Sequence, residues 1–580
     1  MTLNPSLLTF AVAIATSCAA LLVFRALRKR FSKGVAVSAT AALVLTAVAA
    51  GLLYWFQTAK PIIAGSHWEP AVAYSVTGTV ANSPGITSYF KRISASTSAP
   101  AGPIVKVSSG MTTGELQSAI SSAPPGATVS FAPGIYSITS ALAIPCNTGL
   151  TFTGPQVTPA TAILASSSPS FTIFNLLNCT SIRIEYLHFA NSPGIWVNNA
   201  DNSGITISHN QFTNLQAAAG VFFAGYLAHE VVGGRLQNTL SDVLIDHNTF
   251  GDPGSCRAEF ASYEDLGGNC AGVLVNVGEA RNITIEYNNF IHVEQGIHFL
   301  QLLTDWKPGV TNSVCVSCTV AYNYVVNYHR IGVEVQTSSP TNPFVFSHNA
   351  VVDPILSYHG TFATSFACCG SSFLTAENGP APGLIFDDNV MIATETQPPT
   401  LGGCPPYGVE FWGNGSQGTN SLVEGNFCNG YVWGYGKSPW AIKHNYICGA
   451  FHKGGYIERQ QQQTDPPVQS DNVTTPTCSE VASHAPTISP AGGSFAGSQV
   501  VTLADPGLNT GIWYTLDGST PAPGSGTARY YTGPFPIAQT TTVKAVGMWG
   551  APNQPLHYPS GYGYVPSSVV SASFFVNSAR

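Results

Sequence analysis

A short motif recurs eight times along this 580-residue chain and limits its fold more than any other feature. Each copy reads as a strand of alternating apolar residues, an Asn at a corner and a second short strand, as in ITIEYNNFIHV from Ile283. The corner residues are Asn210, Asn248, Asn288, Asn323, Asn349, Asn389, Asn426 and Asn445. Such repeats predict a solenoid in which each copy forms one coil and stacks on the next.

The spacing of the corner residues predicts the size of a coil. The shortest gaps are 19 residues, from Asn426 to Asn445, and 26 residues, from Asn323 to Asn349. A coil of three short strands needs roughly 20 to 26 residues, so the longer gaps predict inserted loops. Because Asn tolerates the left-handed backbone and can hydrogen-bond to a stacked copy of itself, we expect it to occupy that conformation at every corner.

The repeat resembles the right-handed parallel β-helix of the pectate-lyase-like superfamily, over residues 104–460. The resemblance implies an all-β solenoid whose N-terminal end is shielded by a cap, and the amphipathic segment Thr113–Ser122 is the expected cap helix. The same solenoid carries lyases, hydrolases, epimerases and binding proteins, so the fold leaves the activity open.

The C-terminal segment has a different character. From Ala485 it resembles the Fn3-like β-sandwich at the end of chitobiase and β-hexosaminidase enzymes, on the motifs DGSTP (Asp517–Pro521) and YTGP (Tyr531–Pro534). The resemblance covers residues 485–580 and implies a carbohydrate-active neighbour, although we expect this module to act as a spacer. Residues 57–103 and 461–484 read as linkers.

The N-terminal residues 1–56 contain two apolar runs, Leu7–Phe24 and Val35–Phe56, each long enough to span a bilayer. The basic sequence RALRKRFSKG lies between them, and the positive-inside rule places it in the cytoplasm. We therefore expect a transmembrane helical hairpin, with everything beyond Gln57 outside the cell membrane. The alternative is a signal peptide preceded by a misassigned start.

The cysteines agree with export. Cys18 lies in the first apolar run, which leaves 13 − 1 = 12 cysteines outside, an even number that favours disulfides. Cys256 and Cys270 bracket one inserted loop and are expected to pair. Cys315 and Cys318 form a CxxC motif, for which a structural bridge is favoured over a redox pair.

The charge balance limits the partners. The exported part has 29 Asp and Glu against 22 − 5 = 17 Lys and Arg, a net charge of −12. This balance argues against nucleic acid as a partner and mildly against long polyanionic glycans.

The second long strand of each coil begins with Gly and an apolar residue, as in GIHFLQ from Gly296. Alternation sends the residue after Gly inward and the next one outward. The outward column therefore reads Trp196, Phe222, Leu274, His298, Glu334, one coil that could not be aligned, and Glu410.

This column provides the candidate site. If one coil separates Glu334 from Glu410, their backbones lie roughly 2 × 4.8 Å apart, which is compatible with the carboxyl pair of an inverting glycoside hydrolase. His298 is expected to hold the charge of Glu334 or to bind a hydroxyl group. Sugar rings of a polysaccharide substrate would stack on nearby aromatic side chains, namely Trp196, Phe222, Trp412 and Trp433.

Two other groups of residues compare poorly with this site. The outward positions of the first strand, two before each corner Asn, read as a solvated face, which sets aside the Asp387-Asp388 pair as a polygalacturonase-like motif. The His residues before the corners, such as His209 and His247, are not expected to bind a metal.

Two alternative functions stay open. A polysaccharide lyase or epimerase would need a basic residue and cations such as Ca²⁺ to neutralise a uronate. The basic candidates are Arg330, Lys443, Lys453 and Arg459. The third possibility is a glycan-binding surface protein or adhesin without catalytic activity. No cofactor is expected for a hydrolase.

Overall fold

The computed structural model describes residues 102–577, apart from short gaps and longer internal segments. The longer segments are 225–230, 253–270, 300–313, 336–343, 354–371, 377–383, 393–407, 412–421, 435–440, 449–455, 460–467, 505–509 and 550–562. The chain divides into two compact units, 1–67 and 68–580, and all described residues belong to the second. The two apolar N-terminal runs and the pair Cys256–Cys270 lie outside the described residues.

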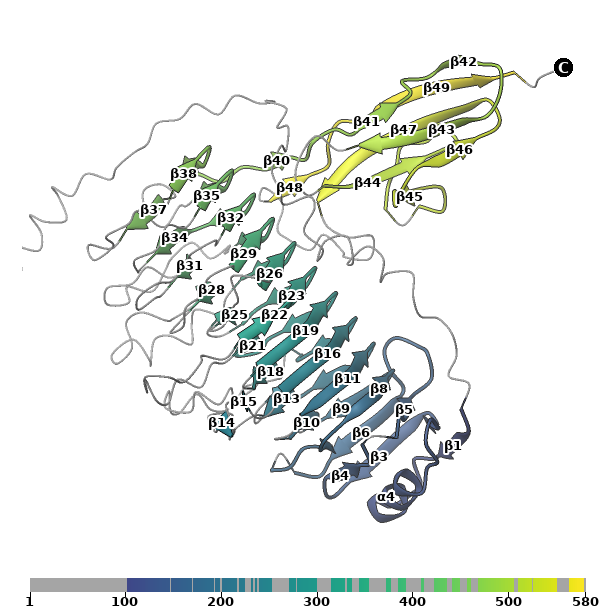
Figure 1. Cartoon of the computed structure of the whole chain (residues 1–580), viewed down its shortest axis with the longest axis vertical. Helices are drawn as coiled ribbons and strands as arrows, with labels where there is room; N and C mark the ends of the chain where they lie inside the picture. Colours follow the sequence, from purple (N-terminus) through teal and green to yellow (C-terminus); the bar gives the residue numbers. More distant parts are fainter. Residues whose placement is uncertain are drawn as a thin grey trace, which may run out of the picture. The chain divides into compact units, whose positions relative to one another are not determined.

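Parallel strands build the region from residue 104 to residue 475, in three sheets that each receive one strand per coil (Figure 1). We name them the first, second and third sheet, in the order in which the chain enters them within a coil. The first sheet has the strands β1 (Ile104–Val107), β2 (Thr128–Phe131), β5 (Thr151–Thr153), β8 (Thr180–Glu185), β11 (Asn202–Ser208), β16 (Thr239–Asp246), β19 (Glu279–Glu286), β22 (Val314–Val316), β23 (Thr319–Ala321), β26 (Phe344–Ser347), β29 (Leu384–Asp387), β32 (Leu422–Glu424), β35 (Ala441–Lys443) and β38 (Val468–Ser470).

The second sheet contains the short strands after the corners. They are β3 (Gly134–Ile138), β6 (Ala162–Ser166), β9 (Leu187–Ala190), β12 (Gln211–Thr213), β17 (Thr249–Phe250), β20 (Asn289–Ile291), β24 (Tyr324–Val326), β27 (Ala350–Val352), β30 (Val390–Ile392), β33 (Phe427–Asn429), β36 (Tyr446–Cys448) and β39 (Val473–Thr475). The strands β38 and β39 add a coil beyond the expected boundary at residue 460.

The third sheet contains the strands predicted from the Gly-apolar pattern, together with others that lack it. They are β4 (Leu142–Ile144), β7 (Phe174–Leu176), β10 (Ile195–Val197), β13 (Ala219–Ala224), β18 (Ala271–Asn276), β21 (Gln295–Phe299), β25 (Ile331–Val335), β28 (Ser372–Ala376), β31 (Gly408–Phe411), β34 (Tyr431–Gly434) and β37 (Tyr456–Arg459). The parallel β-helix predicted from the repeat is confirmed.

The core contains a stack of aromatic rings, to which four successive coils contribute Phe189, Phe212, Phe250 and Phe290. The ring centroids of Phe212 and Phe250 are 4.6 Å apart, and those of Phe250 and Phe290 are 4.9 Å apart. The rings are nearly parallel, and the three residues have no exposed surface. This stack explains the glycines that open the third-sheet strands. A Cβ atom on Gly272 would lie 2.2 Å from Cδ1 of Phe290, so any larger residue would collide with the core.

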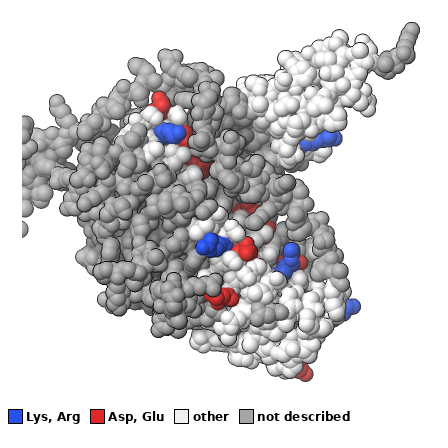
Figure 2. All heavy atoms as spheres, viewed as in Figure 1, with Lys and Arg blue, Asp and Glu red and all other residues white. Residues whose placement is uncertain are grey.

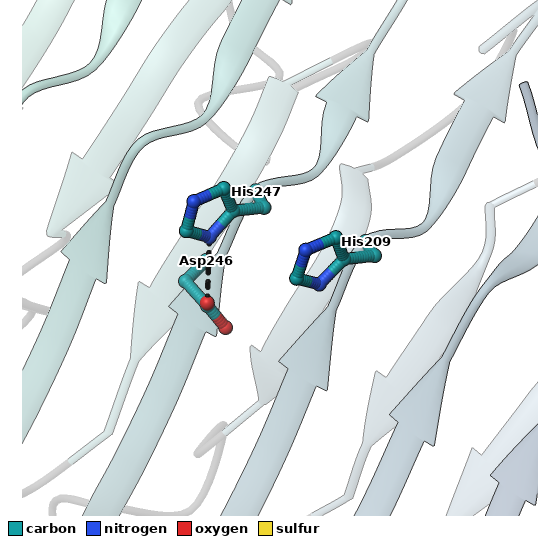
Figure 3. Close-up of side chains that lie close together, drawn as sticks. All are labelled: His209, Asp246 and His247. Carbon is teal, nitrogen blue, oxygen red and sulfur yellow. Dashed lines mark hydrogen bonds and ion pairs between the residues drawn. The ribbon is translucent and has the colours of Figure 1, made fainter. Parts of the chain in front are cut away.

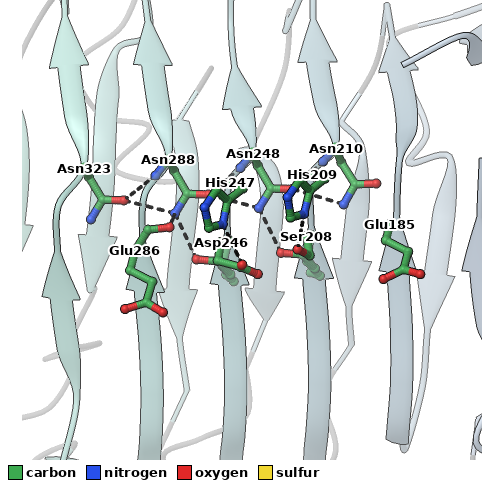
Figure 4. Close-up of polar contacts among 12 residues, drawn as sticks. Glu185, Ser208, His209, Asn210, Asp246, His247, Asn248, Glu286, Asn288 and Asn323 are labelled. Atoms are coloured by element: carbon green, nitrogen blue, oxygen red, sulfur yellow. Dashed lines mark hydrogen bonds and ion pairs between the residues drawn. The ribbon is translucent and has the colours of Figure 1, made fainter. Parts of the chain in front are cut away.

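The corners hold a ladder of hydrogen bonds between Asn side chains (Figure 4). The backbone N–H and Nδ2 of Asn248 both donate to Oδ1 of Asn288, at 2.9 and 3.0 Å, and Nδ2 also donates to the carbonyl of Ile207. The ladder continues to Asn472. The expectation that Asn itself is left-handed was wrong, because the residue before it has that backbone, as His247 does with a φ of 55°.

The N-terminal end of the solenoid carries α4 (Thr113–Ser121), as expected for the cap. Thr112 and Glu115 form a capping box, and the helix buries Leu116 and Ile120 in the core. It is 9 residues long, and the described part of the chain contains no helix with the length and apolar character needed to cross a bilayer.

Residues beyond the solenoid form the expected β-sandwich. Its strands, with the connecting strand β40, are β40 (Val481–Ala482), β41 (Thr487–Ser489), β42 (Gly493–Phe495), β43 (Gln499–Ala504), β44 (Thr510–Thr515), β45 (Arg529–Tyr530), β46 (Phe535–Ile537), β47 (Thr541–Trp549), β48 (Tyr564–Val565) and β49 (Val570–Val576). They bury a core of their own around Val501, Val543 and Phe574. A small hairpin, β14 (Val231–Val232) with β15 (Arg235–Leu236), lies in an insertion of the solenoid.

Three disulfides lie in the described residues, Cys146–Cys179, Cys315–Cys318 and Cys448–Cys478. The expected bridge within the CxxC motif is therefore present. The pairing of Cys256 with Cys270 stays a prediction.

Candidate active site

The register of the third sheet aligns the candidate residues in one column. His298 pairs with Glu334, Glu334 with Thr375, and Thr375 with Glu410. Thr375 thus occupies the coil that the sequence pattern could not align. The backbones of Glu334 and Glu410 are two strand steps apart, about 2 × 4.8 Å.

Glu334 points away from the core, as predicted, because its neighbours Val333 and Val335 point inward and have no exposed surface. Its carboxylate is nevertheless buried, with 1% of the residue exposed. One oxygen, Oε2, lies 3.3 Å from Nε2 of His298 and accepts a hydrogen bond of 2.5 Å from Nε2 of Gln295. The outward position is therefore confirmed, but the side chain is not on an open surface.

A buried carboxylate and imidazole outside the core require a physical reason. Removing a charged group from water costs several kcal/mol, and pairing often only offsets that cost. Apolar residues already occupy this column in earlier coils, where Phe222 and Leu274 stand. The polar cluster of Gln295, His298 and Glu334 is therefore better explained by a function than by stability.

Sequence reasoning missed Gln295. It stands directly before Gly296, at a position that Ala219 and Ala271 occupy in earlier coils. Ala219 and Ala271 pack outside the core with Phe222 and Leu274, so this position faces the same way as the outward column. The change from Ala to a fully buried Gln, in the coil that also brings His298, is the signal that could have found it.

The aromatic candidates have different positions. Trp196 is half-buried, and its ring lies 5.5 Å from that of Phe222. Phe222 is only 7% exposed and packs against Leu274, so the expectation that it stacks on a sugar is not supported by its packing. Trp433 follows Glu410 in the register of the third sheet, and Trp412 lies outside the described residues.

The first sheet corrects another expectation. Its outward positions before the corners are not a solvated face, since Ser347 is 8% and Glu424 7% exposed. Burial raises the pKa of Asp387 to about 6. The pKa of Asp388 is raised well above its ordinary value, first by burial and then by the charge of Asp387.

Glu424 in the same sheet has the opposite shift. Burial alone would raise its pKa, but bonds to His444 and Lys443 outweigh that and lower it. His444 Nδ1 lies 2.8 Å and Lys443 Nζ 3.3 Å from Oε1 of Glu424. Lys443 is therefore engaged in an ion pair away from the third sheet.

His209, Asp246 and His247 come close enough together to suggest a metal site (Figure 3). The two imidazole rings are 4.7 Å apart and almost parallel, at 4°. An ion must lie close to the plane of each ring that binds it, with a bond of about 2.0–2.1 Å, and stacked rings cannot share one without tilting. Nδ1 of His209 contacts Ser208 Oγ at 2.7 Å, and Nδ1 of His247 contacts Asp246 Oδ2 at 2.8 Å. Stacking explains the arrangement better than a metal.

The described surface has few charged groups. In Figure 2, side chains of both signs lie scattered among uncharged residues on this face. This distribution gives no sign of a basic field that would attract a polyanion.

Family models match two parts of the chain. Residues 171–447 match the right handed beta helix region, and residues 490–555 match the chitobiase/beta-hexosaminidase C-terminal domain. No curated protein matches the chain.

Solved structures resemble the chain only distantly. The Agl-KA catalytic domain is 12% identical over 65% of this chain and 69% of its own, with a TM-score of 0.34. A PL6 family alginate lyase, AlyGC, is 11% identical over 64% and 51%, with a TM-score of 0.31. A family 28 exopolygalacturonase of Yersinia enterocolitica is 13% identical over 65% and 79%, with a TM-score of 0.26. Likeness at this level carries no argument about activity.

Proposed function

We propose that this protein acts on polysaccharides, and specifically that it is a glycoside hydrolase. The chain carries a right-handed β-helix and a chitobiase/β-hexosaminidase-type C-terminal domain, which support the proposal. The observation that carries the proposal is the buried cluster of Gln295, His298 and Glu334, with Glu410 two strand steps further along the same column. Backbones about 2 × 4.8 Å apart are compatible with the carboxyl separation of roughly 6.5–9.5 Å that inverting glycoside hydrolysis uses.

The surroundings of the Glu334 carboxyl group suggest how the roles are divided. Gln295 donates a hydrogen bond to Oε2 of Glu334 and thereby orients the carboxylate. Glu334 would then act as the base that activates water, and Glu410 as the acid that protonates the leaving oxygen. His298, at 3.3 Å, would orient the Glu334 carboxylate or bind a sugar hydroxyl. No cofactor is required for this reaction.

The positions of the basic residues favour a hydrolase over a lyase or epimerase. Lys443 is paired with Glu424 in the first sheet. Arg459 lies one position along its strand from the column of Glu334 and Glu410, which continues through Trp433 to Glu458. Arg330 and Lys453 lie outside the described residues. Ca²⁺-dependent cleavage of a uronate would promote the lyase alternative.

We further propose that the protein is anchored in a membrane by Leu7–Phe24 and Val35–Phe56, with the solenoid on the outer side. The support is the basic loop between the two apolar runs. Protease added to intact cells should remove the solenoid and leave the loop at Arg25 protected. Secretion of a chain that starts near residue 50 would establish the signal-peptide alternative.

The activity is tested with residues 57–580 and a panel of neutral and acidic polysaccharides. Glu334→Gln and Glu410→Gln should each lower kcat at least about 10²-fold, the usual contribution of a general acid or base. Glu286→Gln, in the first sheet, is the matched control and should keep full activity. Glycan binding without any product, unchanged in both variants, would indicate an adhesin. Unsaturated uronate products would indicate a lyase.

A further inference from the structure

The outer face of the second sheet changes character along the solenoid. Gln211, Thr249 and Asn289 occupy one outward column in successive coils and are half-buried. The same column continues through Ala350, Val390 and Phe427, which are 3%, 0% and 0% exposed. The side chains at these later coils are apolar although they point away from the β-helix core. An apolar outer face of this kind fits a protein partner.

The left-handed residues at the corners carry a stack of rings, and this stack is interrupted at two of the same coils. Its members up to His348 form a continuous stack with rings 4.7–5.1 Å apart, namely Tyr186, His209, His247, Tyr287, Tyr322 and His348. The next two members are Asp388 and Gly425, with φ of 53° and 68°. The backbone keeps its conformation there, but the chain supplies no ring. The stack therefore has a gap of two coils beside the apolar face.

Two side chains of the C-terminal module fill this gap. The ring of Trp549 lies 6.4 Å from His348 at 22°, and its Nε1 donates a hydrogen bond of 2.8 Å to the carbonyl of Asp388. The hydroxyl of Tyr564 donates a hydrogen bond of 2.6 Å to the carbonyl of Gly425. Trp549 is 4% exposed and belongs to one buried cluster with Val390, Ile392 and Phe427. Each coil without a ring thus receives one from the module.

We propose that these coils are a built docking surface for the chain's own C-terminal module, which is a fixed part of the solenoid and not a spacer on a free tether. We define the surface by Ala350, Val390 and Phe427 with the carbonyls of Asp388 and Gly425. The chain's own module is the occupant because its ring and hydroxyl donors meet both carbonyls. The strand β40, which leads from the solenoid to the module, also pairs with β48 of the module, so the connecting segment is fixed as well.

Hydrogen–deuterium exchange of the full chain tests the proposal. Trp549→Ala should raise amide exchange in β30 and β33 at least about 10-fold, because it uncovers Val390 and Phe427. Trp549→Phe keeps a ring but loses the bond to Asp388, and a smaller increase is expected. Phe575→Ala removes an aromatic of the module that is 53% exposed and lies outside the docking surface, so it should change nothing in these strands.

Exchange in β44 and β47 shows whether the module itself stays folded. If Trp549→Ala unfolds the module, the proposal is tested with Trp549→Phe and Tyr564→Phe instead, because each removes one hydrogen-bond donor and keeps a ring. Unchanged exchange in β30 and β33 in both, or in a folded Trp549→Ala variant, would overturn the proposal. Two independent thermal transitions in the wild-type chain, one for each part, would overturn it as well.

Discussion

Nε2 of His298 lies 3.3 Å from Oε2 of Glu334, and both side chains are 1% exposed although they point away from the hydrophobic core. A pair of this kind is expensive to build and adds little stability, because desolvation offsets the attraction between its members. A functional pair of this kind should therefore add little to the free energy of unfolding, whereas a structural pair should add much. Measuring the stability of variants tells the two apart.

Replacing both members of the pair should separate the two roles. His298→Leu alone leaves the buried Glu334 carboxylate without the imidazole beside it and should lower the free energy of unfolding by about 3–5 kcal/mol. The double variant His298→Leu/Glu334→Leu should recover most of that loss in urea unfolding, while activity falls at least about 10²-fold. A double variant as unstable as the single one would show that the pair is structural.

The Asn ladder predicts a large loss at one residue. Asn288→Ala removes the acceptor for two donors of Asn248 and the donor to the carbonyl of Ile245, all buried. Each unsatisfied group costs about 1–3 kcal/mol, so urea unfolding should show a loss of at least about 3 kcal/mol. Asn282→Gly is the control, because it removes an exposed bond to Asp242 at a left-handed residue that Gly tolerates, and it should stay within about 0.5 kcal/mol.

Two glycines give predictions of opposite sign, one in the third sheet and one in the cap helix. Gly272→Ala would place a Cβ 2.2 Å from the ring of Phe290 and should destabilise the chain by about 1–3 kcal/mol, as overpacking does. Gly114→Ala lies in α4 with nothing within 4 Å of the added atom and should stabilise it by about 0.5–1 kcal/mol. Thermal unfolding measures both. An unchanged Gly272→Ala variant would contradict the steric role of this glycine.

Asp387 predicts a dependence of stability on pH. Its folded pKa is raised from 3.8 to about 6, so the folded state binds the proton more tightly than the unfolded state. This contribution to stability is complete below about pH 4 and is lost as the pH rises through about 6. Asp387→Asn removes the titration, so the variant should gain stability relative to wild type between about pH 4 and 7.

The gain of Asp387→Asn should not exceed about 3 kcal/mol, the value of a shift of about two pKa units. Glu424, whose pKa is lowered, acts in the other direction, and its stabilisation is lost only as the pH falls below about 4.5. Asp201→Asn, at an exposed side chain, serves as the control for the urea unfolding series. A constant difference between wild type and Asp387→Asn across this range would contradict the shift.

The sequence by itself determined the solenoid and one column of its site. A period of two within strands and a recurring corner specify which residues point inward, so Glu334 and Glu410 could be assigned to one outward column. The pattern failed where a coil departed from it, as at Thr375, because β28 does not begin with Gly and an apolar residue. It also placed the left-handed residue one position too late, since Asn and the His or Tyr before it are both polar and both tolerate a corner.

Only the tertiary structure decided what surrounds the column. Gln295 and Glu334 are 39 positions apart in the sequence, and only the stacking of their coils brings the amide and the carboxylate together. The contact of Trp549 with Asp388 joins residues 161 positions apart, and neither is unusual among its neighbours in sequence. Strand periodicity is a local property and can be read along the chain. Burial depends on which distant segments meet, and that is settled only when the chain folds.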